Sequence, residues 1–214
     1  MIDTFNSADY RLHEKISSDR LIYKYKVKKD NSDEIYFGKI IRRPKDETQE
    51  QIYEEMKIKF INEKDILKEL NYPTIAKLIG YSPNGIEHKQ EPAILTEYGK
   101  KGTLQDVIKQ SREKTGWDFI SKLINIYGIL SGMLYLHSKN IVHRNLNPIN
   151  IFETDNYTPL IDGLENSIKL NENEQSRVCK IVGFAMYIAP EVIKKQIYSK
   201  KSDVFSFAMI VYEI

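Results

Sequence analysis

The hydrophobic pattern of the chain changes its period near Gly99, and this change most constrains the fold. Before Gly99, residues 23–28 alternate aromatic or apolar side chains with lysines, as the two faces of a β-strand do, and residues 35–41 predict the second strand of a hairpin. After Gly99, apolar residues recur at helical spacing. We therefore expect an α+β chain in which a short connector joins a strand-rich part to a helix-rich part, with a cleft between them.

One helix is predicted within the strand-rich part, and its apolar face contains an acid. The residues of this face step by three or four: Ile52, Met56, Phe60, Glu63, Leu67 and Leu70. Because a carboxylate in a buried stripe must meet a cation or lose its charge, Glu63 is a candidate functional residue. Two further strands are predicted over residues 75–80 and 93–98.

The helix-rich part begins with a short helix over residues 104–110. A long helix follows over residues 117–137, with one face formed by Ile120, Leu123, Tyr127, Leu130 and Leu134. From there to about Pro190 the sequence is rich in loops. Nine of the eleven residues 204–214 are apolar, which predicts a helix buried on all sides. No capping glycine follows, so we expect that a C-terminal part, which would cover this helix, is missing.

Composition excludes several classes of protein. The 32 basic and 30 acidic residues give a net charge of +2, too balanced for a nucleic-acid partner. A single cysteine, Cys179, excludes an internal disulfide. Residues 1–6 lack the features of a secretory signal. The sequence contains no unbroken run of about 18 apolar residues, so we expect no membrane-spanning segment. We expect a soluble cytoplasmic protein with protein partners and no membrane partner; its oligomeric state stays open.

Residues 143–150 read His-Arg-Asn-Leu-Asn-Pro-Ile-Asn, which resembles the catalytic loop H-R-D-L-x-x-x-N of protein kinases. Other segments resemble kinase motifs in the family's order: Lys39 on the third strand, Glu63 on the following helix, the gatekeeper and hinge at Thr96, Glu97 and Tyr98, residues 189–191 as A-P-E, and residues 202–207 as the start of the central helix. The resemblance favours the tyrosine-kinase-like group, which includes serine/threonine enzymes.

The resemblance implies a bilobal protein-kinase-like fold. Residues 1–9 would be an N-terminal extension, residues 10–98 the strand-rich N-lobe, and residues 99–214 a helical C-lobe truncated after its central helix. In the family, Lys39 held by Glu63 would clamp nucleotide phosphates. Thr96, Glu97 and Tyr98 would lie beside the adenine, with ATP and Mg²⁺ as cofactors.

Two departures put both cofactors and phosphoryl transfer in doubt. The three positions of the family's glycine-rich loop carry Ser17, Asp19 and Ile22, and a β-branched Ile22 disfavours the backbone conformations open to glycine. Asn145 replaces the aspartate that accepts the hydroxyl proton, and an amide is not basic at neutral pH. Loss of a general base costs about 10²- to 10⁴-fold in rate.

The metal-binding positions are ambiguous. Asn150 matches the family's metal-binding asparagine and also suits a structural role in the loop. A gap-free alignment, which we favour, places residues 163–165 on the D-F-G motif and removes the metal-binding carboxylate. The alternative alignment deletes the phenylalanine and keeps Asp162 as the metal ligand.

Two aromatic residues bear on the adenine position. Phe37 stands where the family has a small alanine above the adenine, and Phe152 stands where an apolar residue lies below it. Stacking of the two rings would contribute about 0.5–1.5 kcal/mol beyond burial. We hypothesise that Phe37 fills the nucleotide site.

Three functional readings follow. The first is a pseudokinase that acts as a binding or regulatory module. The second is an atypical active serine/threonine kinase that uses Asp162 for metal and tolerates Asn145. The third is a truncated fragment that does not fold alone. Arg144 pairs with an activation-segment phosphate in active relatives; here the candidate hydroxyls are those of Ser167, Ser176 and Tyr187.

Overall fold

The computed structural model describes residues 4–19, 21–44, 46–86, 91–113 and 117–214. Contacts divide the chain into two compact units. The first unit comprises Met1–Leu70 and Lys77–Tyr98, and the second comprises Asn71–Ala76 and Gly99–Ile214. Residues 1–3 of the expected extension, and Arg20 within the segment aligned with the glycine-rich loop, lie outside the described residues.

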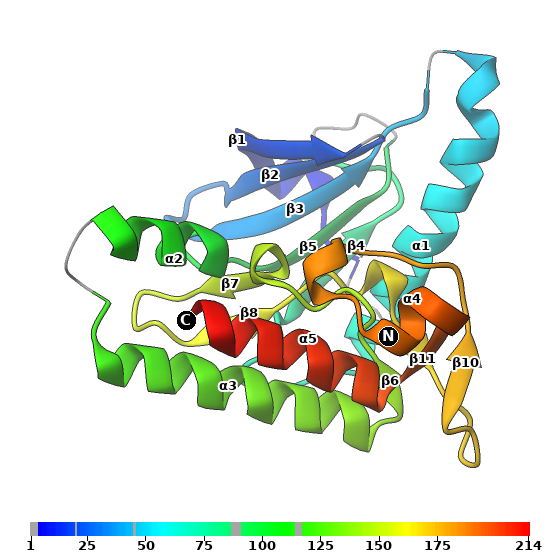
Figure 1. Cartoon of the computed structure of the whole chain (residues 1–214). Coiled ribbons are helices and arrows are strands. Elements are labelled where there is room, and N and C mark those ends of the chain that lie inside the picture. The colour runs from blue at the N-terminus through cyan, green and yellow to red at the C-terminus, as the bar shows by residue number, and fades with distance from the viewer. Residues whose placement is uncertain (1–3, 20, 45, 87–90, 114–116) are drawn as a thin grey trace. The chain divides into compact units, whose positions relative to one another are not determined.

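The first unit is built on an antiparallel sheet in the order β1-β2-β3-β5-β4, beside which helix α1 lies (Figure 1). The elements are β1 (Tyr10–Asp19), β2 (Ile22–Lys29), β3 (Ile35–Ile41), α1 (Glu50–Lys68), β4 (Leu78–Ser82) and β5 (Ala93–Glu97). The predicted hairpin of residues 23–41 is confirmed. The strand predicted over residues 75–80 begins later, at Leu78. Ile75 itself belongs to the second unit and forms a bridge there to Ile161.

The apolar face predicted for α1 is buried, with one exception. Met56, Phe60 and Leu67 are at most 8% exposed, and Glu63 is buried with them. Ile52 is 36% exposed, and Tyr53 takes its place in the buried face. The prediction for Ile52 was therefore wrong: the buried residues step by 3, 4, 3 and 4 from Tyr53, so at the start of α1 the buried face passes through Tyr53 and not through Ile52.

The second unit combines helices with three short two-stranded sheets, β6 with β9, β7 with β8, and β10 with β11. Its strands are β6 (Ile141–Val142), β7 (Ile151–Glu153), β8 (Pro159–Ile161), β9 (Ile168–Lys169), β10 (Ser176–Val178) and β11 (Ile197–Ser199). Its helices are α2 (Leu104–Glu113), α3 (Phe119–Ser138), α4 (Pro190–Lys195) and α5 (Lys200–Glu213). The protein-kinase fold expected from the sequence is consistent with this α+β arrangement.

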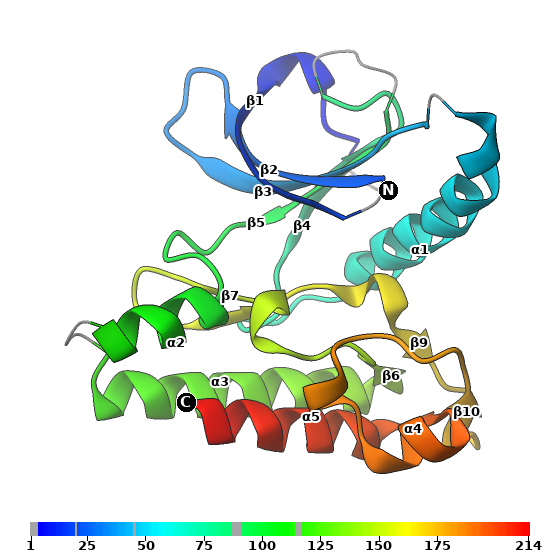
Figure 2. The same ribbon diagram turned by 45° about the horizontal axis from the view of Figure 1, so that its top comes forward.

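Helix α3 lies beside α5 (Figures 1 and 2) and contacts β8 through glycines. A methyl group on Gly128 would lie 2.6 Å from Cγ of Pro159, and one on Gly132 would lie 2.8 Å from Cδ1 of Ile161. The buried face is therefore the one with small residues. The five residues predicted to share a face do so, but that face is exposed; Tyr127, for example, is 74% exposed.

By length and mean hydropathy, α3 also satisfies the criterion for a membrane-spanning helix. An 18-residue window of this helix has a mean hydropathy of 1.4, and 33% of that window is buried. Our sequence criterion, an unbroken apolar run, had found no such segment. One such helix is weak evidence for a membrane span, because the core helix of a globular unit can pass the same test; α3 does pack on β6, β8 and α5.

Helix α5 begins with a capping box, in which Ser199 accepts from the backbone of the first turn and Ser202 bonds back to Ser199. Part of α5 is exposed in this structure, which does not contain the C-terminal part that we expect to cover it. Val204 is 51% and Tyr212 is 86% exposed, whereas other parts of α5 contact α3, β6, β11 and the segment of residues 185–187. The missing C-terminal part stays a prediction.

Candidate functional site

In the first unit, Lys39 of β3 forms an ion pair with Glu63 of α1. Lys39 is 3% and Glu63 is 1% exposed, so both charges are removed from water. Because a buried charge without a partner costs several kcal/mol, the two side chains depend on each other. The structure thus brings together the two residues that the kinase resemblance pairs, within one unit.

Phe37 precedes Lys39 by two residues on β3 and shares its face. The Phe37 ring stacks on the ring of Tyr98 with centroids 6.5 Å apart and planes 13° apart, and Nζ of Lys39 lies 5.6 Å from the Phe37 ring centre. Phe37 is 1% exposed. Sequence reasoning proposed Phe152 as its stacking partner; Phe152 belongs to the second unit, so that pairing stays a prediction.

The gatekeeper and hinge positions lie on and after β5. Thr96 is opposite Phe37 in the β3–β5 ladder and is buried. Glu97 is opposite Tyr36, and its backbone nitrogen donates to the carbonyl oxygen of Lys77. These residues therefore line the same part of the sheet as Phe37 and Lys39.

The segment aligned with the glycine-rich loop is an ordinary hairpin in this structure. Ser17 is opposite Lys24, and Asp19 is opposite Ile22, in the β1–β2 ladder. Strand β1 is at the edge of the sheet, so only part of its backbone N–H groups can pair with β2. At the three glycine positions the chain thus has residues with side chains, and all three lie within paired strands.

In the second unit, the catalytic-loop segment is held by Asp203 at the start of α5. The Asp203 carboxylate accepts from the backbone nitrogen atoms of His143 at 2.8 Å and Arg144 at 2.9 Å, and it contacts Nε2 of His137 at 2.9 Å. Arg144 has φ of +68°, an uncommon conformation for a residue with a side chain. These contacts fix the backbone immediately before Asn145.

Asn145 lies in a network of amides. Its side-chain oxygen accepts from Nδ2 of Asn147 at 3.0 Å, and its backbone oxygen accepts from Nδ2 of Asn147 at 2.8 Å and from Nδ2 of Asn150 at 2.9 Å. Its backbone nitrogen donates to Nδ1 of His143 at 3.2 Å. Nε2 of His143 therefore carries the hydrogen and donates to the carbonyl oxygen of Asp162 at 2.9 Å.

The two candidates for the metal-binding position both lie beside Asn150. The backbone nitrogen of Asp162 donates to the carbonyl oxygen of Asn150 at 2.9 Å, and Asp162 is 2% exposed. Gly163 has φ of +79°, and a methyl group on it would lie 2.6 Å from Cγ of Asn150. The choice between the two alignments stays a prediction.

Among the residues that the structure describes, no three His, Cys, Asp or Glu side chains gather to hold a metal ion.

The guanidinium group of Arg144 bridges two points of the activation segment. It donates to the carbonyl oxygens of Asn166 at 2.8 Å and Lys180 at 2.7 Å, and it stacks 4.4 Å from the ring centre of Tyr198. The sequence analysis named a phosphate as the partner of this arginine in active relatives only, and it missed these contacts, because a backbone carbonyl leaves no signal in the sequence.

The three candidate phosphorylation sites differ in access. Oγ of Ser167 is buried and donates to the carbonyl oxygen of His143 at 3.2 Å, whereas Ser176 is exposed. Tyr187 donates to the carboxylate of Glu213, and burial together with this bond raises the pKa of the Tyr187 hydroxyl.

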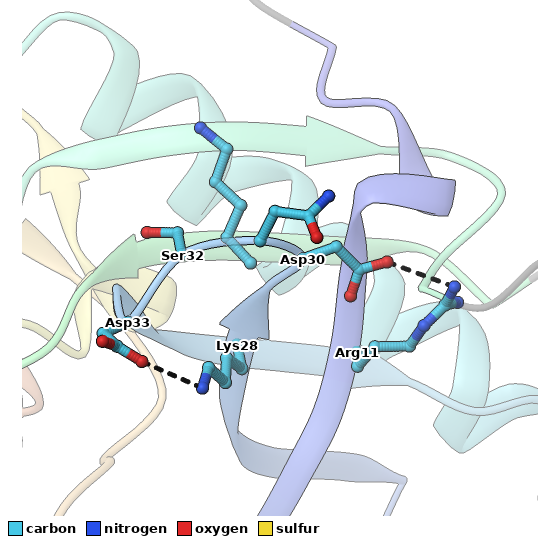
Figure 3. Close-up of a pocket in the computed structure, with 7 residues that line it drawn as sticks. Arg11, Lys28, Asp30, Ser32 and Asp33 are labelled. Atoms are coloured by element: carbon cyan, nitrogen blue, oxygen red, sulfur yellow. Dashed lines mark hydrogen bonds and ion pairs between the residues drawn. The ribbon is translucent and has the colours of Figure 1, made fainter.

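A surface hollow of about 410 Å³ lies at the β2–β3 turn, and none of the predicted site residues lines it (Figure 3). Two exposed ion pairs cross it, Arg11 with Asp30 and Lys28 with Asp33, each at 3.2 Å. Lys29 also lines the hollow, so both signs of charge are present there.

Comparison with known proteins gives a consistent result. A family model described as "Protein kinase domain" matches residues 20–214. The chain is 30% identical over 167 residues to "Calmodulin-binding receptor-like cytoplasmic kinase 3" of Arabidopsis thaliana, a match that covers 76% of this chain and 32% of that protein. It is 33% identical over 162 residues to "Serine/threonine-protein kinase VIK" of the same plant, a match that covers 72% of this chain and 35% of that protein.

A viral relative is similar to the same extent. The chain is 33% identical over 167 residues to "Putative serine/threonine-protein kinase/receptor R831" of Acanthamoeba polyphaga mimivirus, which covers 77% of this chain and 10% of that protein. The chain thus spans about a third or less of the length of these relatives.

Proposed function

Because this chain belongs to the protein kinase family, we propose that it is a kinase domain with impaired phosphoryl transfer, a pseudokinase that acts as a binding or regulatory module for other proteins. Its relatives include serine/threonine kinases. Under this proposal the chain has the fold of the family but does not catalyse efficient phosphoryl transfer.

One observation carries the proposal: the position of the proton acceptor is occupied by Asn145, and its amide oxygen accepts a hydrogen bond from Asn147. Catalysis by this family needs a carboxylate to take the proton of the substrate hydroxyl. An amide oxygen is not basic at neutral pH, so it does not supply that step.

The described residues also do not fit ATP and Mg²⁺ in a catalytic arrangement. The β1–β2 hairpin uses the three glycine positions for strand pairing, and Asp19 adds an acid to that segment. In the second unit, Nδ2 of Asn150 donates to the backbone oxygen of Asn145, which leaves Oδ1 as the atom that could ligate a metal ion, and the gap-free alignment that we favour places no carboxylate beside it. We therefore derive no step of phosphoryl transfer through these groups, and we propose that neither cofactor serves transfer here.

A second candidate function is an atypical active serine/threonine kinase, and two observations favour it. The buried pair of Lys39 and Glu63 is retained, and the backbone of Asp162 is bonded to Asn150. Both arrangements would serve nucleotide and metal binding in an active kinase. In the pseudokinase proposal they hold each unit together.

Transfer of radiolabel from the γ-phosphate of ATP to a generic protein substrate separates the two candidates. The matched control is Lys39→Arg, which keeps a cation beside Glu63 but changes the group that would contact phosphate. We expect equal, background incorporation for the two proteins. Incorporation that is well above background and is lost in Lys39→Arg would overturn the pseudokinase proposal in favour of the active kinase.

Nucleotide binding is measured separately, by thermal unfolding with ATP and Mg²⁺. A ligand that binds only the folded state adds about 2.7 kcal/mol at 100-fold excess over its Kd. We expect no shift in Tm. A shift without incorporation of radiolabel would retain the pseudokinase proposal but reject the idea that Phe37 fills the nucleotide site.

A further inference from the structure

A buried glutamate lies at the end of β7 in the second unit, outside the site described above. Glu153 is 0% exposed. Its backbone nitrogen donates to the carbonyl oxygen of Gly102 at 2.9 Å, and its backbone oxygen accepts from the nitrogen of Lys101 at 3.0 Å. The backbone of Glu153 thus ties β7 to the segment before α2.

The side chain of Glu153 meets an equally buried amide on α3. Nδ2 of Asn125 donates to Oε2 of Glu153 at 3.0 Å and to the carbonyl oxygen of Tyr157 at 2.9 Å. Because the Tyr157 carbonyl can only accept, the Asn125 amide cannot be flipped without loss of that bond. Both hydrogens of the amide are therefore committed.

Two oxygen atoms of this pair stay unsatisfied. Among the described residues, Oε1 of Glu153 and Oδ1 of Asn125 are buried and have no hydrogen-bond partner. Two acceptors cannot bond to each other, and an unsatisfied buried polar group is costly. A single proton on Oε1 turns it into a donor, and an acid and a primary amide can then pair through two hydrogen bonds.

Among the residues that the structure describes, the neighbouring charged groups offer Glu153 no alternative cation. Burial raises the pKa of Glu153 to about 8, while the hydrogen bond from Asn125 acts in the opposite direction. The charged groups on the neighbouring segments have other contacts or are exposed: Lys100 pairs with Asp155, Lys101 lies over the ring of Tyr157, Lys122 donates to the backbone oxygen of Ile214, Asp106 bonds to Thr103, and Lys109 and Arg112 are exposed.

We infer that Glu153 is held as a neutral carboxylic acid whose hydroxyl donates to Oδ1 of Asn125, so that one proton closes an acid–amide pair between β7 and α3. Removal of this proton by base in solvent leaves a carboxylate in the core and breaks the bond to Oδ1. The pair is therefore a pH-sensitive clamp of the second unit. It goes beyond the proposed function and is independent of nucleotide or phosphate chemistry.

The direction of the pH effect follows from linkage. The ordinary pKa of the glutamate is 4.5, and in the folded protein it is raised to about 8. Between these values the folded chain retains a proton that the unfolded chain has released, so stability falls as pH rises. The clamp's contribution is complete below the lower value and is lost as pH rises through the upper one. Within the window, the unfolding constant should rise by about tenfold per pH unit.

Glu153→Gln tests the clamp, because a glutamine amide can donate to Oδ1 and accept from Nδ2 of Asn125 at any pH. Urea unfolding of the wild type and the variant is compared from about pH 5 to about pH 9. We expect the wild type to lose stability relative to Glu153→Gln as pH rises. Parallel profiles for the two proteins would overturn the proposal.

A direct readout guards against a variant that does not fold. Infrared difference spectra of the folded wild type, recorded across the same pH range, should contain the carbonyl stretch of a protonated carboxylic acid near neutral pH. Label restricted to glutamate distinguishes it from aspartate. Absence of that band in the folded wild type at neutral pH would overturn the proposal, whatever the behaviour of Glu153→Gln.

Discussion

Nδ2 of Asn147 donates to the side-chain oxygen of Asn145 at 3.0 Å and to its backbone oxygen at 2.8 Å. The second amide thus holds the first in one orientation. An aspartate at position 145 would accept the same hydrogen bond in the same place. The loop geometry therefore tolerates the acid that the chain lacks, which makes the missing carboxylate directly testable.

We expect that Asn145→Asp folds as the wild type does but does not gain phosphoryl transfer. The reason is that Ser17, Asp19 and Ile22 still occupy the positions where backbone N–H groups would contact phosphates. The measurement is incorporation of radiolabel from ATP, with Asn145→Asp/Lys39→Arg as the blank. A gain of about 10²-fold or more over that blank would mean that the general base was the principal missing part.

Replacement of Lys39 by methionine should destabilise the first unit. The buried carboxylate of Glu63 would lose the cation with which it pairs, and breaking a buried pair in this way costs about 3–5 kcal/mol. Urea unfolding measures the loss.

The double variant Lys39→Met/Glu63→Leu is the control for this prediction, since replacing both charges by apolar groups is often neutral or stabilising. We expect it to recover most of the lost stability. A single variant as stable as the wild type would show that the ion pair does not hold α1 to the sheet.

Spacing predicted the elements better than the faces they bury. Residues 119–138 form the expected helix, yet the apolar face read from Ile120 and Tyr127 is exposed. The buried face contains Gly128 and Gly132, which allow the helix to approach β8 closely. A hydrophobicity pattern identifies the most apolar face of a helix, but a helix packs closely on a strand through the face with small residues. Hydrophobicity alone therefore does not identify the buried face of α3.

Among the polar pairs, too, one could be predicted from the sequence and another could not. Lys39 and Glu63 could be paired from sequence because a lone acid in an apolar stripe demands a cation. The pair of Asn125 and Glu153 was missed, since each looks like an isolated polar residue in an apolar segment and their contact joins separate elements. The signal was present as two polar interruptions, but their pairing depends on tertiary packing.

Gly163→Ala should be more destabilising than a similar change at another left-handed glycine. Gly163 has φ of +79°, and its new methyl group would lie 2.6 Å from Cγ of the buried Asn150. Gly102 has φ of +86°, but the nearest atom to its methyl group is a carboxylate oxygen of the exposed Asp106, at 3.0 Å. Strain of this kind costs about 1–3 kcal/mol, and the clash adds to it only at Gly163. Equal losses in urea unfolding for Gly163→Ala and Gly102→Ala would contradict the prediction.

Arg144→Lys should loosen the activation segment without a change in phosphorylation. A guanidinium group donates to two carbonyl oxygens at once, those of Asn166 and Lys180, whereas an ammonium group lacks this planar fork. We expect faster amide hydrogen exchange over residues 167–180 and unchanged exchange in α3. Arg177→Lys is the matched control, because it weakens a pair with Glu174 within the same segment but leaves the bridge of Arg144 intact.

Phosphatase treatment of the wild type should not change the exchange rates, since the guanidinium group of Arg144 donates its hydrogen bonds to carbonyl groups and not to a phosphate. If phosphatase accelerates exchange as much as Arg144→Lys does, a phosphate holds the segment and the carbonyl bridge does not.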